Sequence, residues 1–475
     1  MASISSLELA DLDALLARDP DQRDARYLRA GLLAHAGRVD EARRDYLELI
    51  ARHPTHFGAL NDLGVLLYNA DFRSAARLAH AEAVKHHPDN PIGRINLANA
   101  LLANGELAAA REHYEAALSL APDHPDAHQG VANLLQDLGE TEAAERHRQR
   151  SYAARDVSIL PCRGRGAPRR VLLLVSAVGG NVPTRFLLDD TVFQTSVMVV
   201  EAYRDGAAPP PHDVVFNAIG DADLCMDALG AAQRVLSRTA APVINRPDAV
   251  RRTGRADSAR RLAGLPGVIT PRLECVPRGV LTEAAEAFGY PLLLRSPGFH
   301  TGRYFERVEA PGDLAAALDA LPGPEIMLIE PLDARDDAGR FRKFRMMIVG
   351  GRLYPLHLAV SERWKVHYFT ADMAERADHR AEEAAFLGDP AAVLGPRAMA
   401  GVERIAERLG LDYAGVDFGL GPDGDILLFE ANATMVVNPP DPDPRWDYRR
   451  APVARILAAV RDLLITRADG GPIRT

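Results

Sequence analysis

Three polar side chains near the end of the sequence have the types and spacing of a magnesium site. Glu430 and Asn432 end the apolar run that follows Asp425, and residues two apart in a strand point to the same side. Asp417, in a preceding strand-like segment, reaches the same place across a hairpin turned at residues 421–424. Carboxylate and amide oxygens are the ligands that Mg²⁺ prefers. We predict that these three residues bind Mg²⁺ in a surface cleft; the alternative is a half-exposed hairpin with solvated acids.

A glycine-containing loop after an apolar strand predicts a phosphate site upstream. Pro291-Leu-Leu-Leu-Arg295 indicates the strand, and residues 297–303 form the loop. A backbone rich in glycine can close over a triphosphate and offer N–H groups to its oxygens. This segment contains Arg295, Gly298, His300, Thr301 and Gly302.

Along the chain, the upstream loop segment followed by the segment with Asp417, Glu430 and Asn432 resembles the ATP-grasp enzymes, such as D-alanine:D-alanine ligase and glutathione synthetase. The resemblance implies that the residues named in the upstream segment bind the nucleotide. The resemblance implies that Arg295 stands where the family usually has a lysine on the α- and β-phosphates. Counting back from Gly267-Val-Ile-Thr-Pro271 places Arg255 at the second family lysine. Both changes keep the positive charge, and the planar guanidinium suits phosphate, although it is not equivalent to an ammonium group. The alternative for Arg255 is a solvated helix residue.

The same resemblance assigns two further strands. Residues 326–331 resemble the strand whose backbone reads the adenine edge, so Glu330 and Leu332 are expected beside the nucleotide. Residues 344–351 resemble the next strand and turn, in which Arg345 would meet the transferred phosphate or the substrate carboxylate. The alternative for Arg345 is a salt-bridged edge residue.

The segment from residue 357 to 368 mixes cationic, aromatic and hydroxyl groups, which we interpret as a substrate-facing surface. Its candidates are His357, Ser361 and His367 for substrate contact and Lys365 for catalysis, beside Arg295 and Arg345. Two loops that follow predicted parallel strands are further substrate candidates, because open α/β sheets bind ligands at the carboxyl ends of their strands. They contain Gly179, Gly180 and Asn181 in one loop and Asp221 in the other. The alternative is that these glycines only make tight turns.

In the family, a carboxylate attacks the γ-phosphate of ATP, and an amine then displaces phosphate from the acyl phosphate to form an amide bond. The resemblance therefore implies an ATP- and Mg²⁺-dependent carboxylate-amine ligase with unidentified acid and amine substrates. Two other functions stay open: an ATP-dependent phosphotransferase, and a non-catalytic, nucleotide-binding interaction scaffold.

These residues need an α/β framework to position them. The continuous apolar runs 171–175 and 214–216 predict buried strands of a parallel sheet. We expect a multidomain protein in which a linker at 157–170, rich in proline, glycine and basic pairs, precedes the enzyme. The resemblance implies a parallel-sheet substrate lobe at 171–250, an α+β ATP-grasp domain of two lobes at 251–466, and a tail at 467–475.

The first third of the sequence repeats with a period of 34 residues. Three columns keep this period: Pro20, Pro54, Pro88 and Pro122; Ala42, Ala76, Ala110 and Ala144; and Ala30, Gly64, Ala98 and Ala132. Small residues let two helices cross closely, and proline ends a helix. The pattern resembles the tetratricopeptide repeat, as an all-α domain at 1–156 with four units from residue 23 behind one capping helix at about 5–18. Such arrays usually bind a peptide or protein, here through Asn61, Arg94, Asn96 and Asn99; the alternatives are a solvated face and a homodimer contact.

Composition limits the remaining possibilities. A formal net charge of -9 argues against broad nucleic-acid binding. The three cysteines form no CxxC pair and favour a reducing compartment. No apolar stretch approaches the roughly 20 residues of a membrane helix, and the acidic start does not resemble a signal peptide. We therefore expect a cytoplasmic protein without membrane contact.

Overall fold

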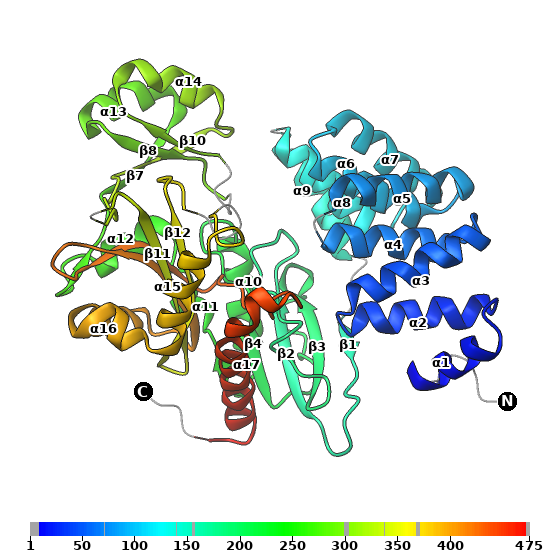
Figure 1. Ribbon diagram of the computed structural model, residues 1–475. Helices are drawn as coiled ribbons and strands as arrows, with labels where there is room; N and C mark the ends of the chain where they lie inside the picture. Colours follow the sequence, from blue (N-terminus) through cyan, green and yellow to red (C-terminus); the bar gives the residue numbers. More distant parts are fainter. Residues whose placement is uncertain are drawn as a thin grey trace. The chain divides into compact units, whose positions relative to one another are not determined.

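The computed structural model of the chain describes residues 9–70, 72–138, 140–153, 157–298, 304–336, 338–366 and 371–471. The chain forms two compact units, Met1–Arg155 and Asp156–Thr475. The first unit is all-α and the second is a mixed α/β unit with three sheets (Figure 1). None of the helices in the described part of the chain is long and apolar enough to cross a membrane.

The all-α unit is a stack of helix pairs behind one leading helix. Consecutive helices pack against each other as α2 with α3, α4 with α5, α6 with α7 and α8 with α9. The bounds are α1 Leu9–Arg18, α2 Arg23–His35, α3 Val39–Arg52, α4 Phe57–Asn69, α5 Arg73–His86, α6 Pro91–Ala103, α7 Leu107–Leu120, α8 Pro125–Asp137 and α9 Thr141–Ala153. The predicted helical repeat is confirmed, with the leading helix beginning at residue 9 in the described part.

The small-residue columns lie where the helices cross. The alanines at positions 42, 76, 110 and 144 are completely buried, as are those at 30, 98 and 132. Pro54, Pro88 and Pro122 lie between one helix pair and the next, and Pro20 lies between α1 and the first pair. The buried small residues of the 34-residue period therefore lie at the close helix crossings that the sequence predicted.

The polar residues predicted for partner binding are partly used inside the stack. Asn96 donates from Nδ2 to Asn61 Oδ1 at 2.8 Å, and Asn61 is 8% exposed. Tyr114 donates to Asn99 at 2.5 Å, and Arg94 donates to the Pro88 carbonyl at 2.6 Å. The bonds of Asn96 and Tyr114 join helices, and that of Arg94 holds the loop before α6. The sequence pattern did not predict this structural role.

The first sheet of the α/β unit has the strand order β1-β3-β2-β4-β5. Its strands are β1 Ser158–Leu160, β2 Arg169–Val175, β3 Phe193–Val199, β4 Val214–Asn217 and β5 Val243–Ile244, parallel except for β1. The predicted buried strands are confirmed. The predicted linker at 157–170 is corrected, because β1 pairs with β3 and β2 already begins at Arg169.

The second sheet is small and antiparallel, with the order β7-β10-β8-β9. Its strands are β7 Leu273–Pro277, β8 Leu292–Arg295, β9 Phe305–Val308 and β10 Glu325–Ile329. The helices α13 Leu281–Phe288 and α14 Leu314–Asp319 cover one face, where Leu281 and Leu314 pack against Leu292 and Ile326 (Figure 1). We call this sheet with its two helices the small lobe.

The third sheet has the order β12-β11-β13-β14-β6 and is antiparallel except for the edge strand β6. Its strands are β6 Val268–Ile269, β11 Phe341–Val349, β12 Arg352–Ser361, β13 Tyr413–Leu420 and β14 Ile426–Asn432. The remaining helices of this unit are α10 Met226–Leu236, α11 Pro247–Val250, α12 Arg255–Leu262, α15 Ala377–Gly388, α16 Pro390–Leu409 and α17 Asp447–Ala468, with 3-10 turns at Val200–Ala202, Arg278–Val280, Pro311–Asp313 and Pro444–Trp446. The predicted hairpin is confirmed, since Gly421 N–H donates to the Asp425 carbonyl at 2.9 Å.

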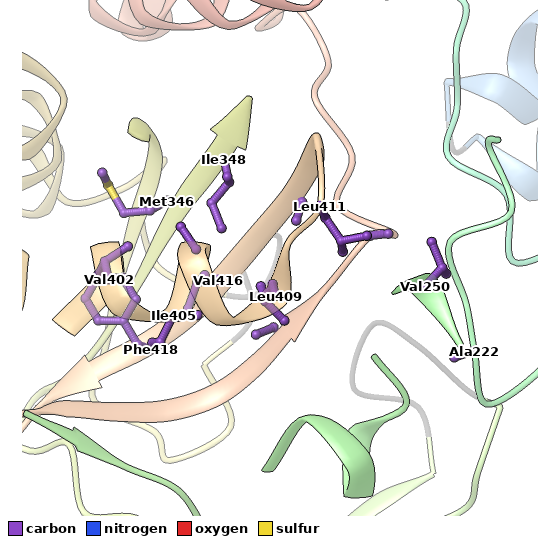
Figure 2. Close-up of a cluster of buried hydrophobic side chains, with 14 of the residues drawn as sticks. Ala222, Val250, Met346, Ile348, Val402, Ile405, Leu409, Leu411, Val416 and Phe418 are labelled. Atoms are coloured by element: carbon purple, nitrogen blue, oxygen red, sulfur yellow. The ribbon is translucent and has the colours of Figure 1, made fainter. Parts of the chain in front are cut away.

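Helix α16 covers the third sheet on one face. Figure 2 shows side chains of α16 beside those of β11 and β13, all within one buried cluster: Val402, Ile405 and Leu409 with Met346, Ile348, Val416 and Phe418. Helix α17 packs on the first and third sheets together, through contacts with β2, β4, β11 and β12. The two sheets thus share their cores and hold their loops in a fixed relation.

The predicted tail at 467–475 begins inside α17. Arg467 is 6% exposed and donates to Asp412 at 2.9 Å, and Asp469 accepts from Arg169 at 2.8 and 2.9 Å. The start of this segment is therefore anchored, while residues 472–475 lie outside the described part.

We expect Gly64→Ala to lower the stability of the helical stack. A Cβ at Gly64 would overlap the ring of His80, which is 2% exposed. Such overpacking costs about 1–3 kcal/mol. Urea unfolding of the full chain, followed by far-UV circular dichroism, measures the loss.

Gly31→Ala is the matched control, because the nearest atom to its Cβ would be the Tyr46 hydroxyl at 3.9 Å. It should leave the stability unchanged or raise it by up to about 1 kcal/mol, since alanine favours helix over glycine. Equal behaviour of the two variants would contradict the packing described here.

Candidate active site

A cleft in the α/β unit lies between the small lobe and strand β14. Its lining also includes the loop after β4 and the start of α12. The small lobe contributes the apolar residues Leu273, Met327 and Ile329 together with Arg295. The charged lining residues are Asp221, Asp223, Arg255, Arg295 and Glu430. The cleft therefore combines apolar residues with a dense set of opposite charges.

Arg255 and Glu430 form an ion pair across the cleft. The side chain of Arg255, the first residue of α12, donates from Nη2 to Glu430 Oε1 at 2.6 Å and from Nη1 to the Phe429 carbonyl at 3.2 Å. Only 14% of the Arg255 side chain and 23% of the Glu430 side chain are exposed. Arg255 is thus not a solvated helix residue.

Arg295 is a buried cation on the opposite wall of the cleft. It ends β8 and is 8% exposed. Burial, and next the neighbouring charge of Arg255, lowers the pKa of Arg295 to about 10. The guanidinium therefore keeps its charge at neutral pH and faces Glu430, Asp221 and Asp223 at longer range.

A second charged cluster adjoins the cleft at Asp417. This residue is the register partner of both Glu430 on β14 and Arg345 on β11. Arg345 donates to its two oxygens at 2.5 and 2.7 Å, and Lys343 donates at 3.0 Å. Asp417 is 2% exposed, so the cations replace water as its partners. The surface position predicted for Asp417 is corrected by this burial.

Burial and charge set the protonation states in this cluster. Burial alone would raise the pKa of Asp417, but Arg345 and then Lys343 outweigh it and hold that pKa well below its usual range. His357 pairs with Arg345 across β11 and β12 and is 7% exposed. Burial, followed by the charge of Arg345, moves the pKa of His357 well below its usual range. Asp417 is therefore anionic and His357 neutral at pH 7.

The residues predicted for Mg²⁺ are close together and have fitting chemistry. Glu430 and Asn432 lie on the same strand two residues apart, and Asn432 Nδ2 donates to Glu430 Oε1 at 2.8 Å. Asp417 is the register partner of Glu430 on the adjacent strand. Hard oxygen donors and nearby cations suit a divalent metal carried with phosphates. In this structure both carboxylates are paired with cationic side chains, Asp417 with Arg345 and Lys343 and Glu430 with Arg255, and metal binding stays a prediction.

The two predicted substrate loops meet at the carboxyl ends of β2 and β4. The Gly180 carbonyl accepts from the N–H groups of Gly220 and Asp221 at 2.9 and 3.1 Å, and Asn181 forms a bridge with Ile219. A Cβ on Gly180 would lie 2.7 Å from Cys225 Sγ, so the close approach explains this glycine. Asp221 accepts from the N–H groups of Asp223 and Leu224, at the turn that starts α10. These contacts are structural, and substrate binding by the loops stays a prediction.

Other predicted residues lie away from the cleft lining. Glu330 accepts from the Arg272 N–H at 2.8 Å, and Leu332, which follows β10, is half-buried. Ser361 is 3% exposed and accepts from the Arg363 N–H at 3.1 Å. Lys365 donates to the Phe305 carbonyl at 2.8 Å. Two residues of the predicted phosphate loop, Pro297 and Gly298, line the cleft. His300, Thr301, Gly302 and also His367 lie outside the described residues.

Two charged residues of the site were not predicted from the sequence. Lys343 lies two positions before Arg345 on β11, so the same period-2 reasoning that joins Glu430 with Asn432 would have found it. Asp223 lines the cleft and accepts from the Arg255 N–H at 3.0 Å, and burial raises its pKa. Only the fold reveals Asp223, because α12 is its partner.

Comparison with known proteins identifies the all-α unit. The family model described as Tetratricopeptide repeat matches residues 9–57 and 64–125, so this part of the chain consists of tetratricopeptide repeats, which suggest a protein-interaction role. None of the curated proteins compared matches the chain.

Solved structures also show a likeness. A MamA fragment from Desulfovibrio magneticus RS-1 shares 19% identity over 30% of this chain and 81% of its own, with a TM-score of 0.29. PilF of Pseudomonas aeruginosa shares 23% identity over 31% of this chain and 67% of its own, also with a TM-score of 0.29. At these scores the likenesses carry no functional argument.

We expect Asp417→Asn to lower the free energy of unfolding by about 3 kcal/mol or more, because it leaves Lys343 and Arg345 without a buried counter-charge. Asp425→Asn, in the same hairpin, is the control. The side chain of its partner Arg397 is 58% exposed, and such pairs contribute less than about 1 kcal/mol. Urea unfolding at pH 7 measures both.

The stability difference between wild type and Asp417→Asn should depend on pH. The native pKa of Asp417 is depressed, so its contribution is complete above the unfolded pKa of about 3.9 and is lost as pH falls below it. The difference should be the same at pH 7 and pH 5 and smaller at pH 3.5. A difference that grows on acidification would contradict the assigned ion pairs.

Proposed function

We propose that the unit Asp156–Thr475 is an ATP-dependent carboxylate-amine ligase that works through an acyl phosphate. One observation carries the proposal: Glu430 and Asn432 line a cleft together with Arg255 and Arg295, and the adjoining Asp417 is paired with Arg345 and Lys343. This combination of hard oxygen donors and cations next to an apolar slot suits a magnesium nucleotide. The predicted order of strands along the chain, now observed, supports the same reading.

In the proposed reaction, a carboxylate oxygen of the acid substrate forms a bond to the γ-phosphorus of ATP. The bond from that phosphorus to the β,γ-bridging oxygen breaks, and ADP leaves. The amine nitrogen then attacks the acyl carbon, the bond to the phosphate oxygen breaks, and inorganic phosphate leaves as the nitrogen loses its proton to solvent. No residue of the chain becomes covalently attached.

The residues of the chain would act by positioning and by charge. Arg255 and Arg295, which line the cleft, would contact the phosphates of the nucleotide, and Arg345 with Lys343 would neutralise the transferred phosphoryl group. Asp417, Glu430 and Asn432 would hold Mg²⁺, which supplies additional positive charge at the phosphate oxygens when bound. The apolar residues Met327 and Ile329 would pack against the base.

The repeat unit would bind a protein or peptide partner, separately from the chemistry. Its helices form their own core, so this role does not depend on the ligase residues. Such a partner would be a substrate of the ligase or a carrier that brings one.

Purified protein with Mg·ATP and a small-molecule extract or peptide pool tests the proposal. We expect ADP release that depends on the pool, together with a product whose mass equals two pool compounds minus water. A phosphorylated product would replace the ligase with a phosphotransferase. Nucleotide binding without any turnover would favour a binding scaffold.

We expect Glu430→Gln to reduce ADP release by a factor on the order of 10²–10³, since it removes a charge from the proposed metal set. The amide can still accept a hydrogen bond from Arg255, so the fold should persist. Glu407→Gln, on the exposed side of α16, is the control and should keep full turnover. Turnover of Glu430→Gln equal to that of the control would refute the proposed metal set.

A further inference from the structure

Three stacked side chains, Arg295, Phe305 and Trp364, join the small lobe to the segment after β12 beside the cleft. The ring of Phe305, the first residue of β9, lies 5.3 Å from the guanidinium carbon of Arg295, its register partner on β8. Phe305 also contacts the indole of Trp364 in an edge-to-face arrangement, with ring centroids 5.3 Å apart and planes at 67°. Trp364 belongs to the segment that follows β12, so the stack connects the small lobe with that segment.

A hydrogen bond fixes the same junction. Lys365 donates from Nζ to the Phe305 carbonyl at 2.8 Å, and its ammonium lies 3.9 Å from a carboxylate oxygen of Glu306. The two consecutive residues Trp364 and Lys365 thus hold Phe305 by its ring and by its backbone. Neither Trp364 nor Lys365 is itself a lining residue of the cleft.

We infer that Trp364 is a positioning residue for nucleotide binding, acting on Arg295 through Phe305. Arg295 is a long side chain that loses rotamer freedom when it is held, and an aromatic ring over a desolvated guanidinium stabilises the charge. Trp364 packs on the Phe305 ring and keeps it over the cation, so the guanidinium is already oriented toward the cleft. The inference rests on the proposed nucleotide site and goes beyond it, because it links phosphate contact to the docking of the segment after β12.

The same contacts give Lys365 a different role from the catalytic one predicted. Its ammonium is directed to β9, where it holds the partner strand of Arg295. Phosphate binding is therefore expected to depend on the small lobe and on the segment after β12, since the cation comes from β8 and its support comes from that segment.

A double-mutant cycle with a nucleotide-binding readout tests the inference. Calorimetry with Mg²⁺ and the non-hydrolysable analogue AMP-PNP gives Kd for the full chain, Trp364→Ala, Arg295→Ala and the double variant. Trp364→Ala should weaken binding about tenfold, equal to about 1.4 kcal/mol, and should have no further effect once Arg295 is alanine. Trp364→Phe should restore most of the affinity because it keeps an aromatic ring.

Trp446→Ala is the matched control, as Trp446 is the other tryptophan of the chain and packs on Arg449, 4.1 Å from its ring centroid. It should bind nucleotide like wild type, with circular dichroism confirming the fold of each variant. Wild-type affinity in Trp364→Ala, or equal losses with and without Arg295, would overturn the inference while leaving the ligase proposal intact. No nucleotide binding by the wild type would overturn both.

Discussion

A carboxylate that is shielded from water requires compensating charge, and Asp417 sets this requirement at the middle of the third sheet. Strand β11 meets it on one side by presenting Arg345 and Lys343. On the other side β14 brings Glu430 next to Asp417, and Glu430 in turn requires Arg255 from α12. The positions of the charged residues in and beside the cleft follow from these ion pairs, which compensate the carboxylates on two neighbouring strands.

The rest of the α/β unit supports that arrangement by packing. Helix α16 covers one face of the third sheet, and α17 joins the third sheet to the first. The small lobe adds Arg295 and the apolar wall of the cleft, and it contacts the segment after β12 through Trp364 and Lys365. Charges in the cleft thus come from elements with separate cores, so a bound anion with several oxygens would contact several elements at once.

The repeat unit is organised by a different constraint. Each helix pair repeats the same close crossing at an alanine or glycine, and its polar residues partly serve contacts between neighbouring helices, as Asn61 and Asn96 do. Stability in such a stack comes from contacts between nearest neighbours. The unit can therefore change its partner-binding surface without affecting the charge network of the α/β unit.

The sequence by itself determined the repeat, the buried strands and the pairing of Glu430 with Asn432, because these depend on local periods of 34 and two residues. Only the tertiary structure decided that Asp417 is buried against Arg345, 72 residues away, and that Arg255 meets Glu430, 175 residues away. It also placed β1 in the expected linker and turned Lys365 toward β9. Contacts of this kind depend on cross-strand register and on where loops return, which no local pattern specifies.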